Sequence, residues 1–279
     1  MKDRVWYLGP LGNVRPLPTP ETDMDFTVTA YGGVHQGLSG ARTKDITGHK
    51  SELSLSWSYL QPDEYAWLQA MHEGYFPGPF YLLNPLKKNR LSRESSAVRS
   101  VRRDTAGLRI PSGNVNRVRQ VPEDIDLGGM SLMWDSWGSN RTLSFDTDRM
   151  VPVLDEETVT FSVYLLGSTG FSVDVWLSYF DADGGTEGES ERQSFTMSTS
   201  FQRVSVTATV GSSVVAARPN IEPQTDSGTL AIAAPQLEHG SEATPWGLGG
   251  AASTVLIDEL TTTSPRYPLY GAELSLLEA

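Results

Sequence analysis

The chain has 279 residues and a formal net charge of −12 at pH 7, with 34 acidic residues against 22 lysines and arginines. Such an excess of negative charge repels nucleic acid and anionic membrane surfaces, so no specific nucleic-acid binding is expected. The sequence contains no cysteine, which excludes disulfides, thiolate metal sites and a cysteine nucleophile, and its length favours two domains over one.

The opening "MKDRVWYLGPLGN" lacks the apolar core of a signal peptide, and no apolar run is long enough to span a bilayer. We therefore expect a protein made in a cytoplasm, with no signal peptide and no membrane insertion. The 26 glycines and 17 prolines, with abundant serine and threonine, are typical of short strands joined by turns.

Residues 1–90 begin with a proline-rich arm and continue with strand-like segments. In "ELSLSWSYL" large and polar residues alternate, which places the large ones on one face of a strand that covers a core. These large residues are Leu53, Leu55, Trp57 and Tyr59.

A short helix is predicted next, in "QPDEYAWLQAMHEG". Pro62 suits the first helical position, acidic residues follow it in the first turn, and Gly74 is a typical stop. Leu68 and Met71, three residues apart, give this helix an apolar face.

The aromatic segment "YFPGPFYLLNP" is interrupted by prolines, which favours a sheet edge or a subunit contact over an interior strand. Packing within its own domain is the alternative. The candidate interface residues are Tyr75, Phe76, Phe80 and Tyr81.

Residues 87–103 carry seven basic side chains against one acid, Glu94, which marks a boundary. They form either a solvated linker that pairs with acidic neighbours or a local contact with phosphate or an acidic partner. The basic residues are Lys87, Lys88, Arg90, Arg93, Arg99, Arg102 and Arg103.

Residues 104–246 have a different texture, with alternating strands separated by turns such as "DADGG". Strands with one apolar and one polar face predict an antiparallel sandwich of two facing sheets. The clearest examples are "TVTFSVYLL", "FSVDVWLSYF" and "FQRVSVTATV".

This series, with its closing "LAIAAPQLEHGSEATPW", resembles the carbohydrate-binding-module type of jelly roll found in many phage tail and cell-surface proteins. The closing strand of that family carries a "PQLE.G..AT.W" signature, and the resemblance spans about residues 95–246. The signature is matched by Pro235, Gln236, Leu237, Glu238, Gly240, Ala243, Thr244 and Trp246.

The preceding stretch "GHKSELSLSWSYLQPDEYAWLQAMHEGYFPGPFYLLNPLKKNRL" is similar to the N-terminal part of distal tail or minor tail proteins of long-tailed phages of actinobacteria, through the spacing of its aromatics and "PGPFYLLNP". Residues 247–279 are too apolar for a free tail and too few for a core of their own, so we expect them to complete the first domain. The predicted fold is therefore mainly β. Residues 1–90 and 247–279 form a tail-tube-like β-sandwich with one short helix, residues 95–246 form an inserted β-jelly-roll, and "GLGGAAS" is a flexible splice.

The resemblance implies a structural virion protein of the tail tip, with six copies in a ring that joins the tail tube to the baseplate or tip. The implied partners are the tail tube protein, the tape measure protein and tail hub or tip proteins, and the jelly roll is expected to face outward towards host cell-wall glycan. Two alternatives stay open: a carbohydrate-binding surface module and a glycan-cleaving tail enzyme.

A sugar site needs aromatic faces flanked by hydrogen-bonding side chains. Trp176, on the polar register of its strand between Asp174 and Ser178, is one candidate, and Trp134 with Trp137 in "LMWDSWGSN" is a second. A purely structural role for each tryptophan is the alternative.

No catalytic activity is predicted, because the four histidines are scattered and the sequence has no nucleophile, metalloprotease or phosphate-loop motif. The acidic clusters 155–157 and 187–191 are interpreted as solvated turns. Jelly rolls of this type often hold a structural calcium, for which Asp181 and Asp183 are weak candidates; turn chemistry alone also explains them.

Overall fold

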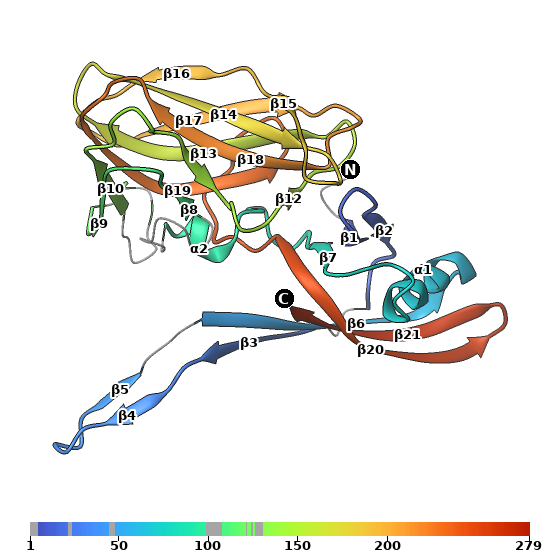
Figure 1. The fold of residues 1–279 in the computed structure, drawn as a ribbon. Helices are drawn as coiled ribbons and strands as arrows, with labels where there is room; N and C mark the ends of the chain where they lie inside the picture. Colours follow the sequence, from blue (N-terminus) through green and yellow to red (C-terminus); the bar gives the residue numbers. More distant parts are fainter. Residues whose placement is uncertain are drawn as a thin grey trace. The chain divides into compact units, whose positions relative to one another are not determined.

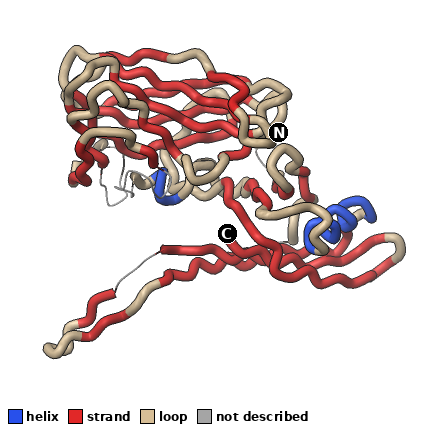
Figure 2. Tube along the Cα trace, in the orientation of Figure 1, coloured by secondary structure: helices blue, strands red, loops and turns tan. Residues whose placement is uncertain are grey.

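A computed structural model describes residues 5–21, 24–44, 48–98, 108–120, 122–123, 125 and 131–279. Strands dominate it, as Figure 2 shows, and the mainly β class with sandwich-like sheets is confirmed. The chain divides into two compact units. We call 5–82 with 253–279 the split unit, and 83–252 the inserted unit.

The split unit is built on a sheet with the strand order β2-β1-β7-β20-β21-β6-β3, so the C-terminal strands pair with strands from the first part of the chain. Its elements, labelled in Figure 1, are β1 (Trp6–Gly9), β2 (Arg15–Leu17), β3 (Asp25–Tyr31), β4 (Val34–Gln36), β5 (Arg42–Lys44), β6 (Gly48–Leu60), α1 (Pro62–His72), β7 (Phe80–Leu83), β20 (Ala252–Arg266) and β21 (Leu269–Glu278).

Helix α1 is confirmed and covers one face of this sheet. Gln61 caps it with a reciprocal bond to Glu64, Pro62 opens it, and Gly74 follows it with a positive φ of 79°. Buried residues of α1 share one hydrophobic core with residues of β6, β7 and β21. That apolar interface, more than helix propensity, holds the short helix in place.

Strand β6 departs from strict alternation near its end. Leu53, Leu55 and Trp57 are buried as predicted, but Tyr59 is 64% exposed and Leu60 is fully buried. The pairing of β6 with β21 shifts register between the partners of Trp57 and Leu60, and this irregularity exchanges the two faces of the strand. The prediction that Tyr59 faces the core is therefore wrong.

Strand β7 lies between β1 and β20, so the prediction of a sheet edge for this segment is wrong. The prolines at 77, 79 and 85 fall outside Phe80–Leu83, which leaves every residue of the strand able to donate to a neighbour.

The edge strands of this sheet are β2 and β3, at the two ends of the strand order. The separate arm begins at β3. The separate ribbon of β4 and β5 continues beyond it (Figure 1), and all the residues of those two strands are exposed. Apolar side chains stand in solvent along this arm: Phe26 (47% exposed), Val28 (55%), Tyr31 (49%), Val34 (66%) and Leu38 (fully exposed).

The inserted unit is a sandwich of two antiparallel sheets, ordered β17-β13-β19-β10-β9 and β15-β14-β18-β11-β8, which we call the β13 sheet and the β14 sheet. Its elements are α2 (Arg93–Ser96), β8 (Leu108–Arg109), β9 (Asn114–Val118), β10 (Ser131–Asp135), β11 (Leu143–Phe145), β12 (Val151–Pro152), β13 (Thr158–Gly167), β14 (Ser172–Phe180), β15 (Thr186–Glu189), β16 (Gln193–Thr196), β17 (Gln202–Thr209), β18 (Ala216–Pro223) and β19 (Thr229–His239).

The sandwich core lies between these sheets. Phe145 of the β14 sheet packs on Phe161 of the β13 sheet, with ring centroids 5.4 Å apart. Strand β13 is buried on its second face as well, because Trp246 and Phe201 pack against Tyr164 and its neighbours there.

The closing signature has a structural role. Glu238, 1% exposed, accepts hydrogen bonds from the backbone N–H and the hydroxyl of Thr244 at 2.9 and 2.6 Å. Gln236 accepts from the N–H of Gly247 at 2.8 Å, and the Trp246 indole donates to the carbonyl of Pro235. These contacts fold the segment after β19 back onto the strand.

Candidate functional site

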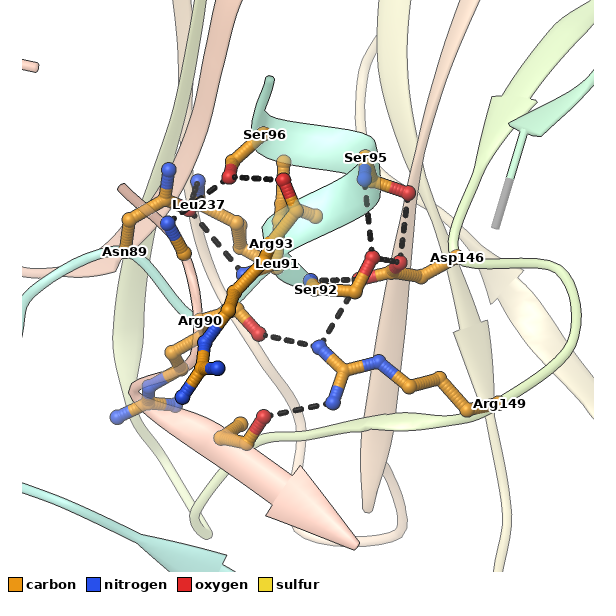
Figure 3. A network of polar contacts seen from close by, with 12 residues as sticks. Asn89, Arg90, Leu91, Ser92, Arg93, Ser95, Ser96, Asp146, Arg149 and Leu237 are labelled. Carbon is orange, nitrogen blue, oxygen red and sulfur yellow. Dashed lines mark hydrogen bonds and ion pairs between the residues drawn. The ribbon is translucent and has the colours of Figure 1, made fainter. Parts of the chain in front are cut away.

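The most connected buried polar cluster of the inserted unit is shown in Figure 3. Asp146, fully buried, accepts hydrogen bonds from the Ser92 N–H, the Ser92 and Ser95 hydroxyls and Arg149. Asn89 uses its whole amide: it donates to the carbonyls of Pro235 and Gly247 and accepts from the N–H groups of Leu91 and Leu237.

A buried ion pair lies beside this cluster. Arg90 binds both carboxylate oxygens of Glu157 at 2.6 and 2.8 Å, and His239 Nδ1 lies 2.6 Å from one of them. Burial alone would raise the pKa of Glu157, but the charge and hydrogen bonds of Arg90, with the N–H of Leu154 and His239, hold that pKa below its ordinary value. The interpretation of 155–157 as a solvated turn is thus wrong for Glu157. Arg90 pairs with an acidic neighbour, as the linker interpretation predicted, but it is buried and not solvated.

The segment predicted as a flexible splice is held by the same cluster. The N–H of Gly249 donates to Ser96 Oγ at 2.8 Å, and the N–H of Gly250 donates to the carbonyl of Leu91 at 2.7 Å. A Cβ on Gly249 would lie 2.2 Å from the Leu91 carbonyl oxygen, so this glycine allows close backbone approach. Because the polar groups of this cluster form hydrogen bonds with one another, we assign it a structural role. It holds the segment that enters the inserted unit against the segment that leaves it. The predicted basic residues Arg99, Arg102 and Arg103 lie outside the described residues.

The outer face of the β14 sheet has the chemistry of a binding surface. Along one row, Arg109 of β8 pairs with Ser144 of β11, Ser144 with Asn220 of β18, and Asn220 with Trp176 of β14. We call this surface the Trp176 face. It comprises Arg109, Ser144, Asp174, Trp176, Ser178, Phe180, Arg218, Asn220 and Glu222, with Thr142 bonded to Glu222 beside them.

Hydrogen bonds fix the middle of the Trp176 face. Ser144 donates to the Asn220 carbonyl oxygen at 2.6 Å, and the Asn220 amide donates to Ser178 at 2.9 Å. Serine hydroxyls and an amide beside an aromatic ring match the hydroxyl rim and C–H face of a sugar.

Trp176 is 2% exposed, and Arg192, from the β15–β16 connection, stacks on it with Cζ 3.9 Å from the ring centroid. Arg192 is 44% exposed and pairs with Glu189 at 3.0 Å and Glu222 at 3.3 Å. Exposed ion pairs of this kind are worth about 0–1 kcal/mol, so moving the guanidinium aside is inexpensive. Trp176 Nε1 is buried and has no hydrogen-bond partner in the described part of the chain.

Arg218 lies next to this row, with Cζ 4.6 Å from the ring centroid of Phe180. Its Nε is buried and makes no hydrogen bond within the described residues. Burial lowers the pKa of Arg218 and nearby Arg109 lowers it further, against the raising effect of Asp146 and Asp148.

The structure brings together Asp174, Trp176 and Ser178 of the predicted sugar residues, and separates the other two from any surface. Trp134 and Trp137 are 0% and 1% exposed, pack on each other at 5.1 Å, and donate their indole N–H groups to the carbonyls of Ser112 and Thr225. Neither ring can stack on a sugar, so the prediction of a binding cluster there is wrong.

The predicted interface residues also differ among themselves. Tyr75 is 75% exposed, whereas Phe80 is 4% exposed and belongs to the core of the split unit. Phe76 packs on Trp67 at 4.9 Å, and Tyr81 is half-buried. Phe80 therefore offers no contact surface, and Tyr75 stays a prediction.

Asp181, one of the two calcium candidates, accepts hydrogen bonds on Oδ1 from the N–H groups of Asp183 and Gly185 at 3.0 and 2.7 Å. This is a side-chain-capped turn. Among the described residues no group of three or more acidic or histidine side chains could hold a metal ion.

Within the same residues, none of the helices is long and apolar enough to cross a membrane.

Sequence reasoning missed Arg109, Ser144, Arg192, Arg218 and Asn220. A signal existed for two of them, because Arg218, Asn220 and Glu222 alternate with apolar residues in "AARPNIEP", as Asp174, Trp176 and Ser178 do in their own strand. Two such strands side by side produce one polar face.

No family model and no curated protein matches the chain. Solved structures do match part of it. The enzymatically active domain of tailspike protein 4 of bacteriophage CBA120 aligns with a TM-score of 0.40 and 14% identity, over 55% of this chain and 21% of that one, so the match spans about a fifth of the tailspike domain.

Two carbohydrate-binding modules match the same share of the chain. The CBM22-1 xylan-binding domain of Paenibacillus barcinonensis Xyn10C aligns with 16% identity and a TM-score of 0.38, over 55% of this chain and 94% of the module. TmCBM61, solved with beta-1,4-galactotriose, aligns with 13% identity and a TM-score of 0.38, over 55% of this chain and all of the module.

Proposed function

We propose that this chain is a structural subunit of a phage tail tip whose split unit assembles into a ring and whose inserted unit binds glycan on the host surface. The observation that carries the assembly role is the apolar arm of β3, β4 and β5. An edge strand with exposed Phe26 and Val28 is a template for pairing with another chain. Pairing with a second copy would cover it, and repeated pairing closes a ring.

The hexameric state and the tail partners come from the sequence resemblance. We propose the tail tube, tape measure and tail hub or tip proteins as neighbours, and the virion tail as the location. Images of the purified chain, alone and mixed with tail tube protein, are expected to show six-fold rings. A strictly monomeric chain that also fails to associate with tube protein would overturn the assembly role.

The glycan-binding role is favoured by the Trp176 face, where an indole is surrounded by hydroxyl, amide and carboxylate groups within one flat sheet surface. Isothermal titration or array binding of the full chain against cell-wall polysaccharides of the host tests it. Trp176→Ala is expected to abolish binding, because the aromatic platform is lost. Binding that is unchanged in this variant would place the glycan elsewhere.

We do not propose catalysis. Asp174 and Glu222 are cross-strand neighbours, but the Glu222 carboxylate is already engaged by Arg192 at 3.3 Å and by Arg141 at 3.7 Å. Incubation of the full chain with bound polysaccharide is expected to release no reducing ends. Release that is lost in Glu222→Gln would instead support the glycan-cleaving tail enzyme.

A further inference from the structure

We infer that the ligand of the Trp176 face is an acidic glycan, and that Arg218 and Arg109 hold its negatively charged group. This rests on the proposed glycan-binding function and specifies the chemical class of the sugar. It assigns recognition of charge to one end of the face and recognition of the sugar ring to Trp176.

The two arginines are placed to act on one ligand. Arg109 occupies the same row as Trp176, connected to it through Ser144 and Asn220. Arg218 is two residues from Asn220 on β18, so its side chain leaves the same face of the sheet. A saccharide that stacks on Trp176 and crosses Asn220 therefore reaches both guanidinium groups.

Some arginines of the Trp176 face and its border form ion pairs with carboxylates, and others do not. Arg192 and Arg141 are each paired with Glu222, and Arg192 also with Glu189. Within the described residues, no carboxylate forms an ion pair with Arg109 or Arg218. Asp146, the acid that acts most strongly on Arg218, is occupied by Ser92, Ser95 and Arg149.

Among the described residues, two neighbouring cations with no carboxylate in ion-pair contact are unusual in a chain whose net charge is −12. Their mutual repulsion is relieved when an anion lies between them, and part of the cost of burying Arg218 is recovered in the same step. Phe180 holds the Arg218 guanidinium by stacking, which limits the entropy lost when it binds.

The shape of the guanidinium group also fits this ligand. A guanidinium presents its donors in a planar fork that matches the two oxygens of a carboxylate or phosphate. A uronic acid supplies this oxyanion from a carboxylate on the sugar ring, and a teichoic-acid-type polymer supplies it from a phosphodiester. The hydroxyls of Ser144 and Ser178 lie beside the arginines and can bind the adjoining sugar hydroxyls.

The test is binding of the full chain to pairs of glycans that differ mainly in charge. The pairs are polygalacturonate and its methyl ester, glucuronan and glucan, and glucosylated poly(glycerol phosphate) and glucosylated polyglycerol, each titrated at low and high salt. We expect at least one acidic member to bind about tenfold or more tightly than its neutral counterpart, with the difference shrinking at high salt. The uronate and phosphate pairs distinguish the two sources of the oxyanion.

Variants separate the two parts of the site. Arg218→Gln and Arg109→Gln are expected to remove the preference for the acidic member while weak binding to the neutral one persists, and Trp176→Ala is expected to remove both. Arg266→Gln, the same change at an exposed arginine of the split unit, is the matched control and should change neither.

The outcomes are distinct. Equal binding of neutral and acidic members that still depends on Trp176 would overturn the acidic-glycan inference and leave the proposed function standing. Absence of binding to every pair and to intact host cell walls would overturn both. A preference for acidic members that survives Arg218→Gln and Arg109→Gln would overturn the assignment of these residues.

Discussion

At the scale of single residues, we expect Arg192 to control access to the indole of Trp176, on which it stacks. Removing its side chain in Arg192→Ala should expose the ring, so the fluorescence emission should shift to the red and become more easily quenched by acrylamide. Stability should fall by about 1 kcal/mol or less, and glycan affinity should stay equal or rise. Trp176→Phe is the reference that isolates this indole from the other six tryptophans. A variant with unchanged emission and lost binding would mean that Arg192 itself contacts the sugar.

Arg90 differs from Arg192, because its ion-pair partner, Glu157, is fully buried. Arg90→Ala leaves the Glu157 carboxylate in the interior with only the Leu154 N–H and His239 as partners, which should cost about 3–5 kcal/mol of unfolding free energy. The double variant Arg90→Met/Glu157→Leu should be less destabilised than Arg90→Ala, since both charges are removed together. Urea denaturation of the three proteins measures the difference. If the double variant were the least stable of them, the ion pair would be a net source of stability.

The same pair predicts a pH dependence. Because Glu157 has a pKa below its ordinary value of 4.5 in the folded protein, it binds a proton more weakly folded than unfolded. Its stabilising contribution is therefore complete above that ordinary value and is lost as the pH falls through the lower folded pKa. Glu157→Gln should reduce the loss of stability between neutral pH and acid, as measured by thermal unfolding across the range. A profile identical in shape to that of the wild type would contradict this role.

At the scale of elements, β3 is the exposed edge on which assembly is proposed to depend. Val28→Lys places a charge among the apolar side chains of the arm, and lysine on an edge strand opposes pairing with a second chain. Because Val28 is 55% exposed, folding should be little affected while the oligomer dissociates.

Sedimentation velocity at several concentrations measures this effect. Ser205→Lys is the matched control, since it places the same charge at an exposed position of β17, the edge strand of the β13 sheet. Equal dissociation by both variants would indicate a general effect of charge, and no dissociation by Val28→Lys would remove β3 from the interface.

Elements with one regular period could be predicted from the sequence. The alternation of Leu53, Leu55 and Trp57 in β6 and the capped apolar helix α1 depend on local patterns that survive folding, whereas the face of β13 predicted to be polar and open is buried. Tyr59 and β7 could not be predicted, because a register shift and the choice of strand neighbours are set by long-range pairing. The sequence shows that residues 80–83 contain no proline, but not that this short run pairs with a strand on each side.

The candidate site was only partly predictable for a related reason. Asp174, Trp176 and Ser178 share a strand, so their common face follows from period two. Arg109, Ser144 and Asn220 come from three other strands, and only the pairing of the sheet aligns them with Trp176. For Trp134 and Trp137 the sequence suggested a binding cluster at the surface, but both side chains are buried in the core.

At the scale of the whole molecule, the contacts between the entry and exit segments of the inserted unit predict that this unit folds independently of the split unit. Asn89 and Gly249 connect the segment that enters this unit to the segment that leaves it, and all of these contacts lie within residues 83–252. Residues 83–252 expressed alone should therefore fold cooperatively and keep the glycan preference of the full chain, but should not form rings. The same piece carrying Gly249→Ala, in which the new Cβ meets the carbonyls of Leu91 and Ser92, should lose about 1–3 kcal/mol. Circular dichroism, urea denaturation and glycan titration measure these properties. If the isolated piece were unfolded, the inserted unit would depend on the split unit for its stability, and the proposal of an autonomous inserted domain would fail.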